Sequence, residues 1–159
     1  MNNRSQIPAY HALWMIVAAS IVVIDRITKV LALIYLPVKQ AVPVNSFFNF
    51  FLVANSGAAF SLGSGNNWLF TLASVVISIL VIFQLVNSDD DKSIWHLSGF
   101  ALILGGAIGN LYDRIALRFV IDFVDLHINE WHWPAFNIAD SAIVVGVLLL
   151  VVTYKQFND

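Results

Sequence analysis

Long apolar runs separated by shorter polar stretches dominate the chain. Trp68 to Val86 contains no charged residue and has about the 20-residue length that a helix needs to cross a bilayer. Apolar patterns of similar length cover Ile94 to Tyr112 and Phe136 to Tyr154. The pattern therefore predicts membrane-spanning helices over residues 68–86, 94–112 and 136–154.

A fourth apolar pattern lies near the N-terminus and is interrupted by charge. Arg4 followed by the apolar run Ala12 to Ile24 is typical of a signal peptide, but no clean small-residue cleavage site follows and the apolar pattern resumes at Val30. The run is also too short to span a bilayer alone. We therefore expect one long helix over residues 10–36, ended by Pro37, because proline disfavours a helical conformation in the residue before it.

Two longer segments, residues 37–67 and 113–135, separate the predicted helices. Phe47 to Asn55 is rich in aromatic and β-branched residues and is followed by turn-forming residues, which indicates a strand. Phe119 to Val124 is a candidate for another short strand. Since an open sheet in hydrocarbon would leave backbone groups unpaired, we expect a small sheet outside the membrane, lying on the bilayer surface.

The number of spans determines which segments share a side of the membrane. With four spans, both termini and the turn at residues 87–93 lie on one side, and the two long segments lie on the other. Lysines and arginines are nearly balanced between the sides, so the positive-inside rule does not orient the protein. The predicted fold class is a membrane all-α bundle of four transmembrane helices with a small extramembrane β-sheet and a second loop segment, built as a single domain over residues 1–159.

The composition supports an integral membrane protein and excludes several functions. The hydrophobic fraction is 59% and the mean hydropathy is +0.79, both above the range of typical soluble chains. A net charge of −2 leaves no basic patch for nucleic acid. The absence of cysteine removes disulfides, thiol nucleophiles and zinc–thiolate sites.

Ionisable residues are concentrated between Gly105 and Asp140, although only 11% of the chain is charged. Charges close to hydrocarbon are costly, and they persist mainly where they perform a function or satisfy one another. This stretch contains four aspartates, two amides and one arginine: Asp113, Asp122, Asp125, Asp140, Asn110, Asn137 and Arg114. The order of the spans brings these groups to one leaflet, which favours an active site there.

The first predicted helix also carries charge at this leaflet. Asp25 and Lys29 are four residues apart, so they share a face and can form an ion pair. Either the pair only neutralises itself inside the bundle, or it supports the site; the sequence leaves both open. Gly105 and Gly109 are likewise four apart, which permits another helix to approach closely.

Other chemistries are compatible with parts of the pattern. Residues 125–127 and 130–132 contain acidic and histidine side chains that could bind a metal, but loop histidines beside interfacial tryptophans more often do not. A serine–lysine hydrolase would pair Lys29 with Ser56 or Ser61, and nothing fixes such a pair. A proton relay would spread its charges through the membrane depth or repeat its halves, and a structural subunit would not need so many polar motifs.

Five motifs together resemble the lipoprotein signal peptidases, the bacterial signal peptidase II family. They are Asp25-Arg-Ile-Thr-Lys29, Asn55-Ser-Gly-Ala-Ala-Phe60, Gly105 to Arg114, Val120-Ile-Asp-Phe123 and Phe136-Asn-Ile-Ala-Asp140. Each motif alone is weak, but five in the family order cover nearly the whole chain. The first departs from the family at Arg26, where Gln is usual. Adjacent residues point about 100° apart on a helix, so we expect little consequence.

The resemblance implies a membrane aspartic endopeptidase that removes the signal peptide of a prolipoprotein by cleaving before its diacylglyceryl-modified cysteine. It implies a catalytic pair, Asp122 and Asp140, with supporting residues Asp25, Lys29, Asn55, Gly57, Asn110, Arg114 and Asn137. It also implies a multi-pass protein of the bacterial cytoplasmic (inner) membrane, with cytoplasmic termini and a site near the extracytoplasmic leaflet. The expected partners are diacylglyceryl-modified prolipoproteins and membrane lipids. We expect a monomer without a metal, a cofactor or a nucleic acid.

Two carboxyl groups can hydrolyse a peptide when one is ionised and the other is protonated. Because like charges raise one of the two pKa values, such a pair tends to share a proton. The ionised group takes a proton from the attacking water, while the other hydrogen-bonds the developing oxyanion. Asn137 is one turn before Asp140 and can hold its carboxylate or donate to the substrate. Asp113 is expected only to cap or pair locally, and Asp125 to point away from Asp122, three residues earlier in a strand.

Overall fold

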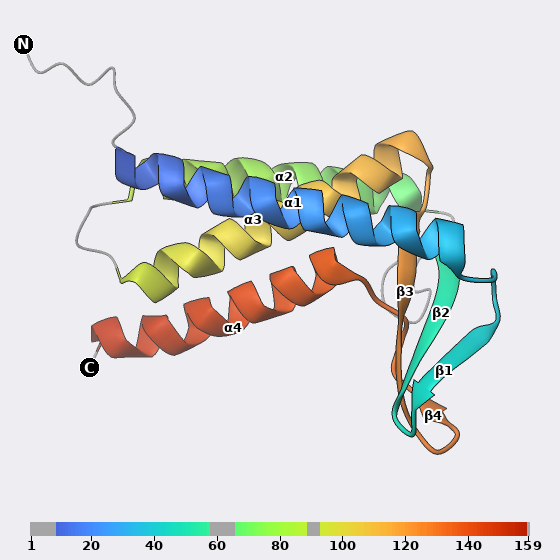
Figure 1. The fold of residues 1–159 in the computed structure, drawn as a ribbon. Coiled ribbons are helices and arrows are strands. Elements are labelled where there is room, and N and C mark those ends of the chain that lie inside the picture. The colour runs from blue at the N-terminus through green and yellow to red at the C-terminus, as the bar shows by residue number, and fades with distance from the viewer. Residues whose placement is uncertain (1–8, 58–65, 89–92, 159) are drawn as a thin grey trace, which may run out of the picture.

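The computed structural model describes residues 9–57, 66–88 and 93–158, which form four helices and a four-stranded antiparallel sheet (Figure 1). The helices are α1 (Ala9–Tyr35), α2 (Asn67–Val86), α3 (Ile94–Ala116) and α4 (Ile138–Asn158). The strands are β1 (Ala41–Asn45), β2 (Phe48–Asn55), β3 (Val120–Ile128) and β4 (Trp131–His132). The predicted combination of four helices with a small sheet is therefore confirmed.

The sheet lies at one end of the helix bundle (Figure 1). α1 ends and α4 begins beside the sheet, whereas α1 begins and α4 ends at the opposite end of the bundle (Figure 1). The strand order is β1-β2-β3-β4. The strand predicted at residues 119–124 is present as β3 and continues to Ile128. A small apolar core of Ala32, Leu52, Ile121 and Phe123 joins α1 to the sheet.

α3 is the central helix, and it packs against α1, α2 and α4. Its glycines allow this, because a Cβ at Gly105 would lie 2.7 Å from the Ala18 carbonyl oxygen of α1. A Cβ at Gly106 would lie 2.3 Å from the Ala139 carbonyl oxygen of α4. The close approach predicted for Gly105 is therefore confirmed, and Gly106 provides a second one on the side of α4.

α3 is longer than its apolar pattern predicted. The predicted span stopped at Tyr112 and assigned Asp113 and Arg114 to the loop, but the helix continues to Ala116. The backbone N–H of Leu117 then closes the helix on the carbonyl oxygen of Asp113 at 2.7 Å. The apolar pattern marked where charge begins, and the helix continues past that point because its charged residues are partnered inside the protein.

The lengths of the helices bear on the membrane. Among the described residues, α2 and α3 are long and apolar enough to cross a bilayer, and the apolar part of α4, Ile138–Thr153, is shorter. Large apolar side chains such as Ile79 and Phe83 of α2 are exposed, as expected of a surface that faces lipid. Crossing of the bilayer by α1 and α4 remains a prediction.

The close packing of α3 on α4 can be tested with Gly106→Ala. The added methyl group would overlap the Ala139 carbonyl oxygen, so the helices must separate, and we expect a loss of about 1–3 kcal/mol of stability, as for other overpacked interiors. Thermal unfolding in detergent measures the effect, with Ser98→Ala on a partly exposed position of α3 as the control. A Gly106→Ala variant as stable as the parent would contradict the packing.

Candidate active site

The start of α4 holds Asp140 in a fixed orientation. Asn137 precedes the first helical residue, and its Oδ1 accepts a hydrogen bond from the backbone N–H of Asp140 at 2.9 Å. In return Asp140 Oδ2 accepts from the backbone N–H of Asn137 at 3.2 Å. This reciprocal arrangement is a capping box with Asp in the third helical position. The predicted contact between Asn137 and the Asp140 carboxylate is therefore confirmed.

The same asparagine also contacts Asp122 at the beginning of β3. Asn137 Nδ2 donates to Asp122 Oδ1 at 2.7 Å, and Asn55 Nδ2 of β2 donates to Asp122 Oδ2 at 2.9 Å. On the other side, Asn110 Nδ2 of α3 donates to Asp140 Oδ1 at 2.7 Å. Asn137 therefore links the two carboxyl groups, and one further amide orients each of them.

A cavity of about 580 Å³ opens in front of the two aspartates. Asp122, Asp140, Asn55, Gly57 and Arg114 are among its lining residues. The remaining lining is mostly apolar, from α4 and from the segment before it: Trp133, Pro134, Ala135, Phe136, Ile143, Val144 and Val145. An extended chain with an apolar attachment fits such a space better than a polar ligand does.

The environment of Asp122 favours its protonated form. Only 1% of the residue is exposed. Burial, and secondly the negative charge of Asp140, raise the pKa of Asp122 to about 7, although hydrogen bonds from Asn55 and Asn137 and the charge of Lys29 oppose the rise. A carboxyl group with this pKa carries a proton in about half of the molecules at neutral pH. This is the protonation state that acid–base catalysis by two aspartates requires.

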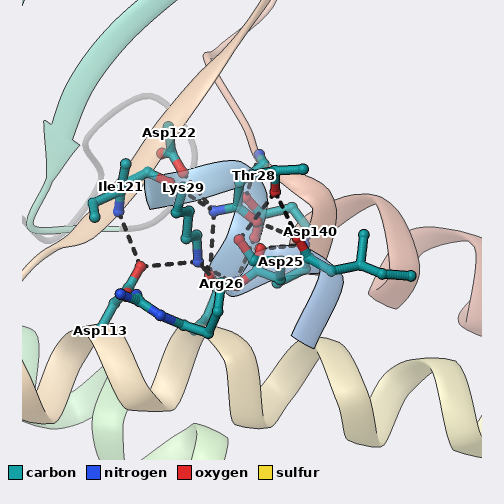
Figure 2. A network of polar contacts seen from close by, with 12 residues as sticks. Asp25, Arg26, Thr28, Lys29, Asp113, Ile121, Asp122 and Asp140 are labelled. Carbon is teal, nitrogen blue, oxygen red and sulfur yellow. Dashed lines mark hydrogen bonds and ion pairs between the residues drawn. The ribbon is translucent and has the colours of Figure 1, made fainter. Parts of the chain in front are cut away.

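The ion pair predicted in α1 is present and has more partners than expected (Figure 2). Lys29 Nζ lies 2.8 Å from Asp25 Oδ2 and 2.9 Å from Asp113 Oδ2, and it donates to Asn110 Oδ1 at 3.1 Å. Asp25 Oδ1 accepts from the backbone N–H of Ala139 at 3.0 Å. Lys29 therefore contacts Asn110, which donates to Asp140, and Asp25 contacts Ala139, which precedes Asp140 in the chain. These contacts favour the hypothesis that the ion pair supports the site over the hypothesis that the two charges only neutralise each other.

Asp113 has a larger role than the sequence indicated. Its side chain is completely buried, and it pairs with Arg26 and Lys29 of α1. The expectation that Asp113 pairs only locally is wrong, because α3 continues past Tyr112 and the Asp113 carboxylate faces α1. Arg26 also has partners that the sequence did not indicate, since it contacts Asp113 and lies over the Tyr112 ring at 4.5 Å.

The remaining predicted site residues border the cavity or support its rim. Arg114 lines the cavity, and its guanidinium lies over the Phe70 ring at 5.7 Å. The backbone N–H of Gly57 donates to Asn55 Oδ1 at 3.0 Å, which holds the amide that contacts Asp122. All nine predicted site residues therefore lie in one connected region.

Asp125 is oriented away from this region, as predicted. Its carboxylate accepts from Asn49 Nδ2 at 2.8 Å and contacts His132 Nδ1 at 2.9 Å. His127 stacks on His132 with 5.1 Å between the ring centres. Within residues 9–57, 66–88 and 93–158, no three His or acidic side chains are arranged to hold a metal ion.

The alternative of a serine–lysine hydrolase is not supported, because Lys29, its proposed base, is in contact with Asp25, Asp113 and Asn110. Of the two candidate nucleophiles, Ser61 lies outside the described residues. A general base must lie within hydrogen-bond reach of its nucleophile, whereas Lys29 Nζ is directed at Asp25 and Asp113.

Comparisons with known proteins agree on one family. Residues 17–155 match the family model described as Signal peptidase (SPase) II. A lipoprotein signal peptidase of Francisella tularensis subsp. novicida is 46% identical over 143 residues, covering 87% of this chain and 88% of the relative. A lipoprotein signal peptidase of Teredinibacter turnerae is also 46% identical, over 142 residues that cover 87% of this chain and 84% of the relative.

Two solved structures of bacterial membrane enzymes have a similar fold. A structure described as a bacterial membrane enzyme at 2.3 Å resolution superposes with a TM-score of 0.82 at 27% identity, covering 91% of this chain and 88% of that chain. A second bacterial membrane enzyme, at 1.9 Å, gives 0.79 at 28% identity, covering 90% and 92%. The arrangement of helices and sheet is therefore that of a known membrane enzyme.

Removing the buried ammonium group tests the charge cluster. Lys29→Met leaves Asp25 and Asp113 without one of their partners, and breaking a buried ion pair typically costs about 3–5 kcal/mol. Adding Asp25→Asn should not restore stability, because Asp113 remains beside the apolar side chain and Ala139 loses a charged acceptor. Thermal unfolding of the two variants in detergent measures this. Full recovery in the double variant would mean that the pair only neutralises itself.

Proposed function

Because the chain belongs to the signal peptidase II family of membrane proteases, we propose that it removes signal peptides from prolipoproteins by cleaving before the diacylglyceryl-modified cysteine. The aspartic class of protease is the one to which this family belongs. The two carboxyl groups, Asp122 and Asp140, are linked through Asn137 and border one cavity. This is the observation that carries the proposal.

In the proposed reaction, the two aspartates activate water between them. The ionised carboxylate removes a proton from the water as it attacks the scissile carbonyl carbon. The protonated carboxyl group donates a hydrogen bond to the oxygen on which negative charge develops. The proton then passes to the leaving amine, and the pair returns to its singly protonated state. The raised pKa of Asp122, about 7, supports this cycle because it lets one carboxyl group carry a proton near neutral pH.

The surrounding amides supply fixed orientation. Asn55, Asn110 and Asn137 each donate to a carboxyl oxygen, so neither aspartate has to be ordered when the substrate binds. Lys29 holds Asn110 in turn. Arg114 lines the same cavity, and its guanidinium can donate to a carbonyl oxygen of the substrate backbone.

The apolar part of the cavity supports a lipid-modified substrate. Ile143, Val144 and Val145 extend along α4 away from Asp140, on a helix whose apolar stretch faces the bilayer in this proposal. A diacylglyceryl chain that lies in hydrocarbon can therefore remain there while the peptide next to it reaches the aspartates. A substrate bound in this way moves little apolar surface into water.

We place the protein in the bacterial inner membrane as a monomeric, multi-pass, single domain. All four helices cross the bilayer in this proposal, with cytoplasmic termini and the sheet on the extracytoplasmic surface. Trp131 of β4 and Trp133 just after that strand are exposed and are suited to the headgroup region. Membrane lipids and prolipoproteins are then its partners, and the two carboxyl groups act without a cofactor.

The catalytic pair predicts the effect of two isosteric substitutions. Asn is nearly the size of Asp but cannot relay a proton, so Asp122→Asn and Asp140→Asn should each lower turnover by roughly three or more orders of magnitude, and the double variant should be scarcely worse. The measurement is cleavage of a diacylglyceryl-modified precursor by purified variants in detergent. Asp125→Asn is the control and should keep substantial activity. Cleavage at the parental rate by either single variant would refute the pair.

The proposed orientation can be read from single cysteines, because the chain has none of its own. Glu130 lies in the turn between β3 and β4, and Asn87 follows α2 at the opposite end of the bundle. Both residues are exposed. Glu130→Cys should react with an impermeant thiol reagent added to intact spheroplasts, whereas Asn87→Cys should react only after lysis. The reverse labelling pattern would invert the topology.

A further inference from the structure

The first residues of β3 pair with β2, and Ile121 among them is also held by side chains from the helical part of the protein. Ile121 is opposite Ala54 of β2 in the sheet. Its backbone N–H donates to Asp113 Oδ2 at 3.2 Å, and its carbonyl oxygen accepts from Asn137 Nδ2 at 3.3 Å. Both backbone groups of the residue next to Asp122 are therefore held by polar side chains of the site region (Figure 2).

We propose that Asp113 is a positioning residue for Asp122 and acts through the backbone of Ile121. This inference rests on the proposed catalytic role of Asp122. Asn137 fixes one side of Ile121 and also contacts the Asp122 carboxylate, so a shift of Ile121 displaces that carboxylate from the amides that orient it. Asp113 holds the other backbone group of Ile121, because its Oδ2 accepts from the Ile121 N–H.

Asp113 can serve as a fixed point because both of its oxygens are used. Oδ1 pairs with Arg26, and Oδ2 lies 2.9 Å from Lys29 Nζ while it accepts from Ile121. The Asp113 side chain is completely buried, and Arg26 is itself packed over Tyr112. A buried carboxylate with this many charge-assisted contacts has little rotational freedom.

The charges around Asp113 explain why Arg26 matters in this chain. Asp25 and Asp113 carry two negative charges, and Lys29 and Arg26 carry two positive ones. With Gln at position 26, Lys29 alone would compensate both carboxylates. Arg26 therefore helps to hold the Asp113 carboxylate against Ile121 without drawing Lys29 away from Asn110.

The experiment compares Asp113→Asn and Arg26→Gln with the parent protein in detergent. Asn has a single acceptor oxygen, so it cannot satisfy Arg26, Lys29 and Ile121 together. We expect Asp113→Asn to lower kcat by about 10- to 100-fold with KM nearly unchanged, because small displacements of a catalytic group have effects of this order. Arg26→Gln should lower kcat less, since Gln can still donate one hydrogen bond to Asp113.

Amide hydrogen exchange separates positioning from general stabilisation. The N–H of Ile121 should exchange faster in both variants. The N–H groups of Phe123 and Val124 should keep their protection, because they donate to the Phe136 carbonyl oxygen. Arg118→Gln removes the same charge at an exposed position and should leave kcat and exchange unchanged.

Three results would overturn the inference. The first is a folded Asp113→Asn variant with parental kcat. The second is equal loss of protection at Ile121, Phe123 and Val124, which would make Asp113 merely structural. If Asp113→Asn does not fold, the third is an Arg26→Gln variant with parental kcat and parental Ile121 exchange. Failure of the proposed function would be recognised separately. The parent protein would then not cleave the precursor, whereas hydrogen exchange at Ile121 could still be compared between the parent and the variants.

Discussion

The structure depends on compensation of charge inside an apolar bundle. Lys29 is completely buried and contacts Asp25 and Asp113, which are also completely buried. Removing several charges from water costs several kcal/mol for each ion, and only close pairing and additional hydrogen bonds offset that cost. Asn110 and the start of α4 supply those bonds. The ion pairs that offset the cost of burying these charges also connect α1, α3 and α4 at the place where Asp140 is oriented.

Much of this arrangement could be predicted from the sequence. The apolar runs located the helices and their number brought the polar segments to one end, whereas the pairing of Asp122 with Asp140 came from the family resemblance. The contact between Asn137 and Asp140 was expected from their separation of one helical turn. These features depend on local pattern and on the order of elements, which a sequence displays directly.

The partners of Asp113 could not be predicted, because they depend on how α1 and α3 are rotated against each other. The apolar pattern ended at Tyr112 and made the next residue look exposed, whereas α3 continues and directs Asp113 towards Arg26 and Lys29. The partner of Arg26 was hidden for the same reason, because Asp113 lies 87 residues away in the sequence. Contacts between distant segments were the information that the sequence pattern lacked.

The central claim is that Asp122 and Asp140 share one proton in the resting enzyme. Carbon-13 spectra of protein labelled at the aspartate carboxyl groups, recorded in detergent across a pH titration, test it directly. The account predicts that the pair loses its last proton near pH 7, and that Asp140→Asn moves this step to lower pH because it removes the neighbouring negative charge. If both carboxyl groups are already ionised at about pH 5, as expected for unperturbed aspartates with pKa values near 4, the account of the site is contradicted.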